Sequence, residues 1–539
     1  MDFQDFDHRD ADAPTVPELD FTEPPLGSDR RAFMMRSALV SAMAVLAGRP
    51  MTALAQAPFA SPALDPVVNV ELDPNLEVVR RSKGPVMTLI DEFYKVGPGP
   101  SSSHTIGPMR ITYDFYQRAT KLPAAQLAEA QKFRVNLFGS LSATGKGHGT
   151  ERASLAGLTG MEPATTDPAF LDGLAADPTQ VFQVKLGSKE IPVSLADVIY
   201  DETKGEFHHP NMMRAYLLGA GDKVLLEQEY YSVGGGFIEW KGYEPPAKAA
   251  PKYPYSTMAE ALAHAERDNI SLAQLMMANE TTISGRSEAE INAFLDKIIG
   301  AMRATVKTGL EAPQGVLPGP IKLKTKAGDV YKNALKEENE ARRGIGLVSA
   351  AALAGSEENA RGHLVITAPT GGSAGVMPAV VYSLGPDGAK LSEGKIRESL
   401  LVAGLIGYLC KHNATLSASE GGCQAEIGVA SAMGAAGIAA AQDESNQVCA
   451  NGAGAALEHH LGITCDPVAG YVQIPCIERC AFGAVKAWTG YLMATNEIPA
   501  NRRVDLDSVI TAMALTAKEM NSKYKETSEG GMAVSLVLC

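Results

Sequence analysis

The stretch Gly428-Val-Ala-Ser-Ala-Met-Gly-Ala-Ala-Gly-Ile-Ala-Ala-Ala441 decides the fold of the C-terminal half. Its alanines favour a helix, and its lack of large side chains suits helices that pack with their backbones close together. Upstream, Thr257-x-x-Glu260 and Ser287-x-x-Glu290 are capping boxes that predict helix starts, and Ile291 to Leu310 carries apolar residues at helical spacing. No comparable strand pattern occurs from about residue 340 onward. The sequence therefore predicts a mostly α-helical domain over residues 257–539.

Towards the N-terminus, from about Leu89, the pattern changes to short apolar runs separated by glycine turns. Such runs predict strands, and residues 124–132 and 151–158 read as helices between them. They indicate an α/β domain over residues 83–245, followed by a proline-rich linker at 246–256. The expected fold is thus a multidomain α+β protein. The predicted strands are Phe133–Phe138, Val181–Leu186, Lys223–Leu226 and Tyr230–Ile238.

All seven cysteines lie from Cys410 onward. Cys423, Cys465 and Cys476 sit in segments flanked by Gly or Pro, which lets the backbone turn and present a thiolate to a ligand. Their wide spacing does not match a zinc ribbon, so an iron-sulfur site gathered from several loops is the better metal hypothesis. The alternative is that the thiols pack as small hydrophobic residues, and Cys410 and Cys449, in apolar helical sequence, fit that alternative well.

Several motifs resemble the bacterial iron-sulfur L-serine dehydratases, in the single-chain form that fuses a beta and an alpha domain. The resemblance runs from about Leu89 to the C-terminus and rests on several ordered motifs. They are Gly99-Pro-Ser-Ser-Ser-His-Thr-Ile-Gly-Pro-Met109, Gly139-Ser-Leu-Ser-Ala-Thr-Gly-Lys-Gly-His148, Gly422-Cys-Gln-Ala-Glu426, Thr464-Cys-Asp-Pro-Val-Ala-Gly470, Pro475-Cys-Ile-Glu-Arg479 and Lys518-Glu-Met-Asn-Ser-Lys-Tyr-Lys-Glu-Thr-Ser528.

The resemblance implies a 4Fe-4S cluster that binds Cys423, Cys465 and Cys476 and leaves one iron open. It also implies that Cys539, the last residue, is a fourth ligand that substrate displaces. An open iron acts as a Lewis acid on the substrate hydroxyl, which makes hydroxide a better leaving group. The implied reaction is β-elimination of water from L-serine to give pyruvate and ammonia. A homodimer is expected from the resemblance alone.

The motif ending at His148 offers the expected base, because imidazole titrates near working pH. Lys146 is a second catalytic candidate, and His104 is the alternative base. For the serine-rich motif the alternative to substrate binding is a helix N-terminal cap, which binds anions through the same backbone groups. The expected substrate-binding residues are Ser101, Ser102, Ser103, Thr105, Thr144, Gly145 and Thr370.

Three departures from the family pattern concern substrate choice and cluster ligation. Gly371 stands where relatives carry an asparagine. Cys480 also stands where relatives carry an asparagine. The segment Ser419-Glu-Gly-Gly422 before Cys423 is also atypical.

Residues 1–57 form a distinct leader. The first 29 residues are acidic and proline-rich and are expected to be disordered. Arg30 and Arg31, an apolar run from Ser37 to Gly48 and a small-residue site ending at Ala55 then resemble a twin-arginine export signal, too short for a stable membrane span. We therefore expect export to the periplasm by the twin-arginine machinery, with a cytoplasmic protein as the alternative.

The formal charge of -14 argues against nucleic acid or an anionic membrane as a partner, since those surfaces bind concentrated Lys and Arg. A small molecule, L-serine, is the expected partner. Two other functions stay open at this point. One is β-elimination from another amino acid, such as L-cysteine desulfidation, and the other is a non-catalytic serine-binding or redox-sensing iron-sulfur protein.

Overall fold

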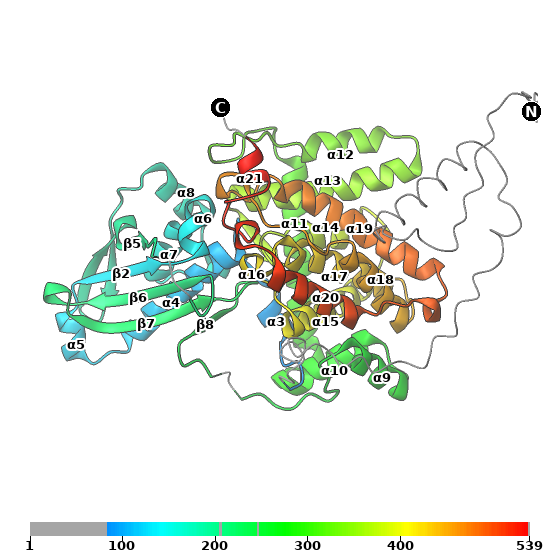
Figure 1. Cartoon of the computed structure of the whole chain (residues 1–539), viewed down its shortest axis with the longest axis horizontal. Helices are drawn as coiled ribbons and strands as arrows, with labels where there is room; N and C mark the ends of the chain where they lie inside the picture. Colours follow the sequence, from blue (N-terminus) through cyan, green and yellow to red (C-terminus); the bar gives the residue numbers. More distant parts are fainter. Residues whose placement is uncertain (1–83, 204–206, 245–246, 537–539) are drawn as a thin grey trace, which may run out of the picture. The chain divides into compact units, whose positions relative to one another are not determined.

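The computed structural model describes residues 84–203, 207–244 and 247–536 (Figure 1). The leader with its twin-arginine segment, and Cys539, lie outside these residues, so the expectations of export and of a fourth thiol ligand stay predictions. Within the described part of the chain, no helix combines the length and the apolar character needed to cross a membrane.

A five-stranded mixed sheet forms the centre of the beta domain, in the order β5-β2-β6-β7-β8. β2 runs parallel to β5, and the other neighbours are antiparallel. β3 and β4 form a separate hairpin. The strands are β2 (Lys132–Leu137), β3 (Phe182–Leu186), β4 (Lys189–Val193), β5 (Val198–Tyr200), β6 (Met212–Leu218), β7 (Val224–Ser232) and β8 (Ile238–Trp240).

Helices pack against this sheet through one hydrophobic core. Ile111 and Phe115 of α4 and Leu155 of α7 belong to the same buried cluster as Phe133 and Val135 of β2, all with no exposed surface. The core therefore fixes α4 and α7, which flank the site motifs, against the sheet. The helices are α4 (Gly107–Thr120), α5 (Ala124–Glu129), α6 (Ser140–His148), α7 (Thr150–Leu158) and α8 (Pro168–Ala176).

The first segment of the predicted α/β domain, residues 90–98, packs on the helical domain and not on the five-stranded sheet. α3 (Ile90–Phe93) packs on α15, where Gly404 and Gly407 leave room for Ile90 and Phe93. β1 (Lys95–Pro98) then pairs antiparallel with β9 (Leu364–Thr367). Because β1 leads directly into the serine-rich motif, this pairing anchors that motif to the helical domain.

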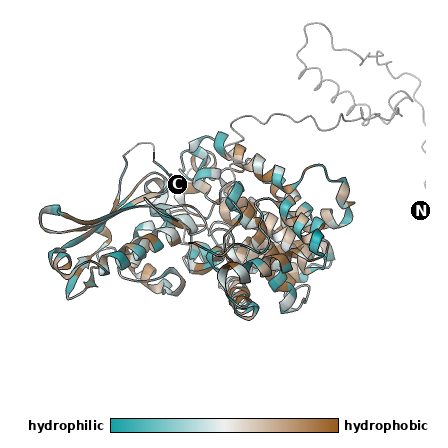
Figure 2. Ribbon diagram, turned by 90° about the horizontal axis from the view of Figure 1, so that it is seen from below, coloured by the Kyte–Doolittle hydropathy of each residue, from teal (hydrophilic) through white to brown (hydrophobic). Residues whose placement is uncertain are grey.

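The helical domain is a bundle with an outer layer of amphipathic helices, along which hydrophobic and hydrophilic residues alternate (Figure 2). The predicted capping boxes are confirmed, with Thr257 and Ser287 accepting from the backbone of Glu260 and Glu290. The helices are α9 (Met258–Asp268), α10 (Leu272–Ser284), α11 (Glu288–Glu311), α12 (Ala327–Lys336), α13 (Glu340–Arg361), α14 (Val376–Leu384), α15 (Glu393–Asn413), α16 (Ala418–Gly421), α17 (Ile427–Ala441), α18 (Asn446–Glu458), α19 (Cys476–Asn496), α20 (Leu506–Glu519) and α21 (Met532–Ser535).

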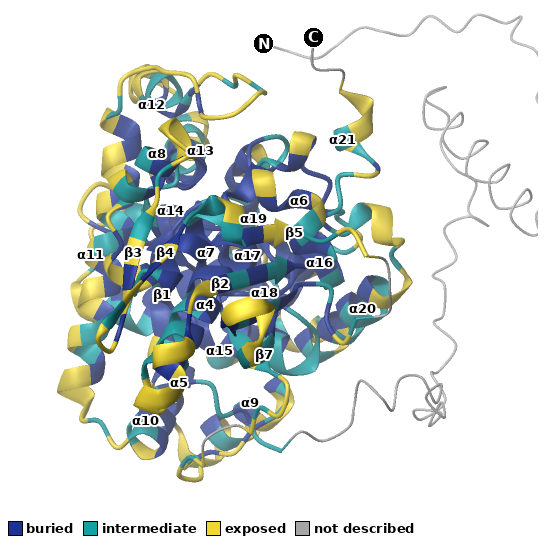
Figure 3. Cartoon of the chain, turned by 90° about the vertical axis from the view of Figure 1, so that its left-hand side faces the viewer, coloured by how far each residue is buried: buried dark blue, intermediate teal, exposed yellow. Residues whose placement is uncertain are grey.

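α17 is the central helix of the bundle and is buried almost along its whole length (Figure 3). It contacts α15, α18 and α19. A Cβ atom at Gly434 would lie 2.9 Å from Ala487 Cβ, and one at Gly437 would lie 2.7 Å from Ser399 Oγ. The prediction of closely packed helices from the Ala- and Gly-rich stretch is thus confirmed, and it fixes the position of Cys423 just before α17.

The expected fold class is confirmed, and three details differ. β9 is a strand in a region where the sequence showed no strand pattern, and it is stabilised by pairing with β1. Residues 224–232 form one continuous strand, β7, which joins the expected strand 223–226 to the first residues of the expected strand 230–238; residues 233–237 of the latter form a turn, and β8 begins at Ile238. The helix expected over 124–132 ends at Glu129, because Lys132 begins β2.

Candidate active site

Three cysteines from three different segments lie near the N-terminal ends of α17 and α19: Cys423 and Cys465 have their sulfur atoms close together, and Cys476 interacts with Cys423 through its charge. Cys423 lies in a single 3-10 turn before α17, Cys476 is the first residue of α19, and Cys465 lies in the loop after α18. All three are buried. The sulfur atoms of Cys423 and Cys465 and a carboxylate oxygen of Glu426 lie within 4.8 Å of one another. The sequence hypothesis of a thiol site gathered from loops therefore has a structural counterpart.

Backbone contacts hold these loops in place. Gly422 has a φ of +71°, and a side chain there would come within 2.7 Å of Ile463 O. Cys465 N–H donates to Tyr524 O, and its carbonyl accepts from Glu526 N–H, both at 2.8 Å. The segment from Tyr524 to Glu526 therefore holds Cys465 through both its backbone N–H and its backbone carbonyl.

One guanidinium group, that of Arg479, lies beside the thiols. A hydrogen bond with Cys465, followed by the charge of Arg479, lowers the pKa of Cys423 to about 7 despite burial. Burial by itself would lower the pKa of Arg479, but Cys423 and Cys476 raise it above its usual value. Arg479 also donates to Asp466 Oδ1 at 3.1 Å. A partly buried positive charge of this kind stabilises thiolates, which are the form that binds metal.

Glu426 is a buried carboxyl group on the other side of Cys423. Burial, and then the nearby Cys423, raise its pKa to about 8. A hydrogen bond with the Thr370 side chain acts in the opposite direction. A Cβ at Gly372 would lie 2.6 Å from a Glu426 oxygen, so the loop of residues 368–373 packs tightly against this carboxyl.

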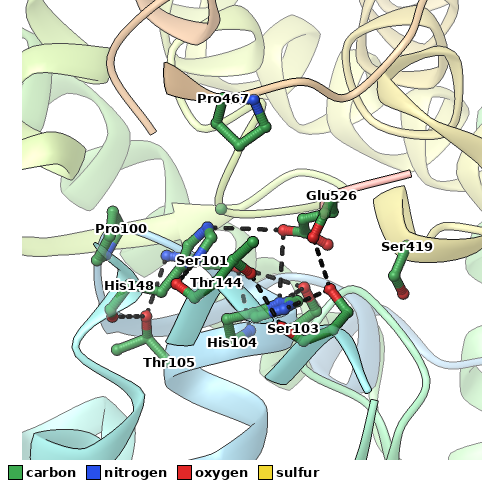
Figure 4. A network of polar contacts seen from close by, with 12 residues as sticks. Pro100, Ser101, Ser103, His104, Thr105, Thr144, His148, Ser419, Pro467 and Glu526 are labelled. Atoms are coloured by element: carbon green, nitrogen blue, oxygen red, sulfur yellow. Dashed lines mark hydrogen bonds and ion pairs between the residues drawn. The ribbon is translucent and has the colours of Figure 1, made fainter. Parts of the chain in front are cut away.

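The beta domain contributes two neighbouring histidines, His104 and His148, which lie close to Glu526 (Figure 4). The rings of His104 and His148 have centroids 4.6 Å apart. Glu526 Oε1 lies 3.4 Å from His104 Nδ1 and 3.6 Å from His148 Nε2. Burial lowers the pKa of His148 to about 4, and burial together with His148 lowers the pKa of His104 well below its usual value. Both imidazoles are therefore neutral near pH 7.

The hydrogen bonds distinguish the two histidines. His104 has partners at both nitrogens, with Ser103 Oγ at 2.9 Å and Ser140 Oγ at 3.0 Å. His148 Nδ1 lies 2.9 Å from Thr144 O, which only accepts, so this nitrogen carries the proton. His148 Nε2 is then a buried lone pair with no hydrogen-bond partner. Of the two candidates, the geometry leaves His148 available as a proton acceptor.

Most of the predicted substrate-binding serine and threonine side chains already have hydrogen-bond partners within the protein, and one serine does not. Ser101 Oγ accepts from His104 N–H as a helix cap, in agreement with the alternative weighed from the sequence. Thr105 donates to His148 O at 2.8 Å, and Thr144 donates to Ser140 O within its own helix. Ser102 Oγ, in contrast, is buried without a partner. It is the hydroxyl of this motif that a ligand can engage.

Two predicted residues lie apart from the histidines. Lys146 is exposed, with Nζ 5.5 Å from the centroid of the Tyr200 ring, because residues two apart on a helix point to different sides. A Cβ at Gly145 would lie 2.9 Å from Tyr200, so Gly145 makes room for that ring. The structure thus does not bring Lys146 or Gly145 to the site.

Four residues that the sequence reasoning left without a role belong to this site: Glu426, Asp466, Arg479 and Glu526. Each lies inside one of the motifs that resemble the family, and this position is the feature of the sequence that could have identified it as a site residue. Glu526 is the most informative of them, because burial, Glu426 and Cys423 together raise its pKa well above the usual range. Its Oε2 atom is buried without a partner.

Two of the three departures from the family pattern, Gly371 and Cys480, lie close together. A Cβ at Gly371 would come within 2.6 Å of Ser102 N, so this glycine lets the serine-rich motif approach the loop. Cys480 is buried on α19, and its Sγ donates to Gly372 O at 3.3 Å. Burial raises the pKa of Cys480 to about 12. We therefore describe Cys480 as a protonated thiol, distinct from the three that converge.

The donor set fits an iron-sulfur cluster. The three buried thiols are soft ligands of the kind that such clusters bind. The guanidinium group of Arg479 lies beside them, and Glu526 Oε2 is a buried oxygen nearby without a hydrogen-bond partner.

The comparisons with known proteins agree with this geometry. The serine dehydratase beta chain profile matches residues 90–243, and the serine dehydratase alpha chain profile matches residues 267–533. The L-serine dehydratase of Haemophilus influenzae is 38% identical over 462 residues, which is 84% of this chain and 100% of the relative. The chain belongs to the serine dehydratase family. Other members are L-serine dehydratase 2 of Escherichia coli, 39% identical with the same coverage, and the L-serine dehydratase of Streptomyces coelicolor, 38% identical over 83% of this chain and 99% of the relative.

The family assignment divides the site between two parts. The beta chain region supplies the serine-rich motif and both histidines, and the alpha chain region supplies the cysteines, Glu426 and Glu526. Fusion of the two serine dehydratase parts in one chain keeps both halves of the site together.

Proposed function

We propose that this protein is an iron-sulfur-dependent L-serine dehydratase, which eliminates water from L-serine to give pyruvate and ammonia. The names of its relatives suggest the substrate. The observation that carries the proposal is the junction of the two halves, where Glu526 contacts the backbone of Cys465 and lies 3.6 Å from the unpartnered Nε2 of His148. A base and a metal-binding thiol set thus share one buried site.

Elimination requires a base for the Cα proton. His148 is neutral near pH 7 and has its lone pair at Nε2, so it can accept a proton without first losing one. Thr144 O fixes the tautomer of His148 by accepting from its Nδ1–H. The Thr105 hydroxyl donates to the backbone carbonyl of His148. His104, with both nitrogens engaged, acts as a positioning residue between Ser103 and Ser140.

The hydroxyl of the substrate requires an electrophile, because hydroxide is a poor leaving group. A 4Fe-4S cluster bound by Cys423, Cys465 and Cys476, with Cys539 as its ligand in the absence of substrate, would supply a Lewis acid for that hydroxyl. Arg479 offsets the negative charge of the thiolates.

The remaining polar groups suit a small polar substrate. Ser102 Oγ and Glu526 Oε2 are buried without partners, and such atoms are costly unless a ligand satisfies them. Elimination releases an aminoacrylate, which tautomerises to an imine and takes up water to give pyruvate and ammonia without further catalysis.

The test is anaerobic purification followed by assays of iron and of pyruvate formed from L-serine. The unchanged protein and Cys449→Ala, which alters a buried thiol on α18 away from the site, should bind iron and form pyruvate. Cys423→Ala should lose both. An iron-loaded protein that forms no pyruvate would contradict the proposal. Sulfide release from L-cysteine exceeding pyruvate formation from serine would instead favour desulfidation.

A further inference from the structure

A cavity of about 100 Å³ lies where the beta and helical parts meet. Its floor consists of buried residues, Thr105, His148 and Gln473, each at most 2% exposed. Its rim contains the exposed residues Asp172, Ala175 and Pro318. The cavity therefore leads from the surface to the histidine proposed as the base, and it has room for several water molecules or for one small amino acid.

The walls of the cavity belong to the segments that build the site. Gly147 and Gly149, on either side of His148, form one wall. Tyr471 and Val472, in the loop between Cys465 and Cys476, form the other wall. No cysteine lines the cavity among the described residues. A ligand inside it would thus contact both site loops without reaching the thiols.

Two guanidinium groups line the cavity from opposite parts of the chain. Arg152 of α7 lies against the backbone beside His148, because a Cβ at Gly149 would come within 2.6 Å of Arg152 Nη2. Its closest acidic atom, Glu151 Oε1, is 4.0 Å away. Arg361, the last residue of α13, pairs with the buried Glu358, which also binds His363. The exposed Asp172 supplies a negative charge at the rim.

Two residues that line the cavity, Gln473 and His148, each have a buried polar atom without a hydrogen-bond partner. Gln473 Nε2 donates to Pro318 O at 2.6 Å, and this hydrogen bond fixes the orientation of the side-chain amide. Gln473 Oε1 accepts no hydrogen bond. His148 Nε2 is the other. A small zwitterionic amino acid fits these groups. The guanidinium groups of Arg152 and Arg361 complement its carboxylate, and the carboxylate of Asp172 and the amide oxygen of Gln473 complement its ammonium and hydroxyl groups.

We propose that this cavity is the vestibule through which the amino acid substrate reaches His148. Arg152 and Arg361 hold its carboxylate, while Asp172 and Gln473 Oε1 receive its ammonium group. The inference rests on the proposed function, since it assigns the access route and the specificity residues of the same site.

The test measures pyruvate formation by the iron-loaded enzyme in variants of the vestibule. Arg152→Gln and Arg361→Gln should each raise KM for L-serine by about tenfold, the effect of losing one charge-assisted hydrogen bond, with kcat within about twofold. Arg361→Lys should recover part of the loss. Arg342→Gln, at an exposed position of the same helix α13, should leave KM unchanged.

A steric variant tests the route without removing a charge. Ala175→Trp at the exposed rim should narrow the mouth and raise KM, whereas Ala176→Trp, the next residue of α8 and not part of the lining, should not. Unchanged KM in Ala175→Trp and both glutamine variants would overturn the vestibule. A change in the Hill coefficient for L-serine without a change in KM would also overturn it, in favour of a regulatory site.

Equilibrium binding separates this inference from the proposed function. Calorimetric titration of the iron-loaded proteins with L-serine should show about hundredfold weaker binding by the Arg152→Gln/Arg361→Gln double variant. Equal binding by the double variant and the unchanged protein would overturn the vestibule even if neither protein forms pyruvate. Absence of pyruvate from the unchanged protein, with binding that depends on the two arginines, would overturn only the dehydratase activity.

Discussion

Glu526 Oε1 lies 3.6 Å from His148 Nε2, so a carboxyl near the end of the described chain contacts a histidine of the beta domain. The same residue donates its backbone N–H to Cys465 O at 2.8 Å. Its φ of +58° is unusual for a residue with a side chain. Glu526 thus links the proposed base to the thiol site, and the surrounding contacts hold it in a costly conformation.

Replacing Glu526 with glutamine should reduce kcat by about 100-fold, because the His148 lone pair would then face an amide in place of a carboxyl that exchanges protons. Iron content should stay unchanged, since the backbone contacts to Cys465 do not involve the side chain. Glu529→Gln, at an exposed position in the same segment, is the matched control. Full activity of Glu526→Gln would exclude a catalytic role for this carboxyl.

Activity should persist at mildly acidic pH. Because burial lowers the pKa of His148 to about 4, the reactive neutral form is lost only as pH falls through about 4. An unperturbed histidine would lose it through about pH 6.5. The acid limb of kcat/KM, measured in short anaerobic assays, reports this pKa of the free enzyme. An acid limb centred near pH 6.5 would show that His148 is more exposed to water than the structure indicates.

The central helix α17 should not tolerate even a methyl group. Gly437→Ala places a Cβ 2.7 Å from Ser399 Oγ and 2.9 Å from Ser399 O, and such overpacking should cost about 1–3 kcal/mol in the free energy of unfolding. Gly300→Ala on α11 has no atom within 4 Å of the new Cβ and should be neutral or slightly stabilising. Urea unfolding of the two variants distinguishes them, and equal stability would argue against close packing of α17.

Glu280 should make stability depend on pH. Burial raises its pKa to about 7, so between about pH 4.3 and 7 the unfolded chain loses a proton that the folded chain keeps. The free energy of unfolding should therefore fall as pH rises through this window, by roughly 4 kcal/mol at most, and level off above it. Glu280→Gln should remove this decrease, and the exposed Glu288→Gln should retain it in urea unfolding at about pH 5 and pH 7.5. An unchanged slope in Glu280→Gln would contradict the assignment.

The parts of the fold that local sequence determines were predictable. Capping residues at Thr257 and Ser287 specify helix starts through contacts three residues away, and the small residues of 428–441 specify a tightly packed helix. The pairing of β1 with β9 was not predictable, because each strand has four residues and its partner lies far away in the sequence. Neither strand has the alternation that marks a longer half-buried strand.

The site shows the same division. The motifs identified the three converging cysteines and His148, but they could not distinguish His148 from His104, since only the partners at each nitrogen do so. Glu526 gained significance only from the return of its segment to Cys465. Lys146 shares a motif with His148, yet helix geometry directs it to the surface.

The most direct test of the central claim is the turnover of iron-loaded His148→Asn. The account predicts that this variant binds iron and L-serine like the unchanged enzyme but forms pyruvate at least about 100-fold more slowly, because Nε2 is the proton acceptor. Single-turnover pyruvate formation, normalised to iron content, measures this. A rate within about threefold of the unchanged enzyme would contradict the account.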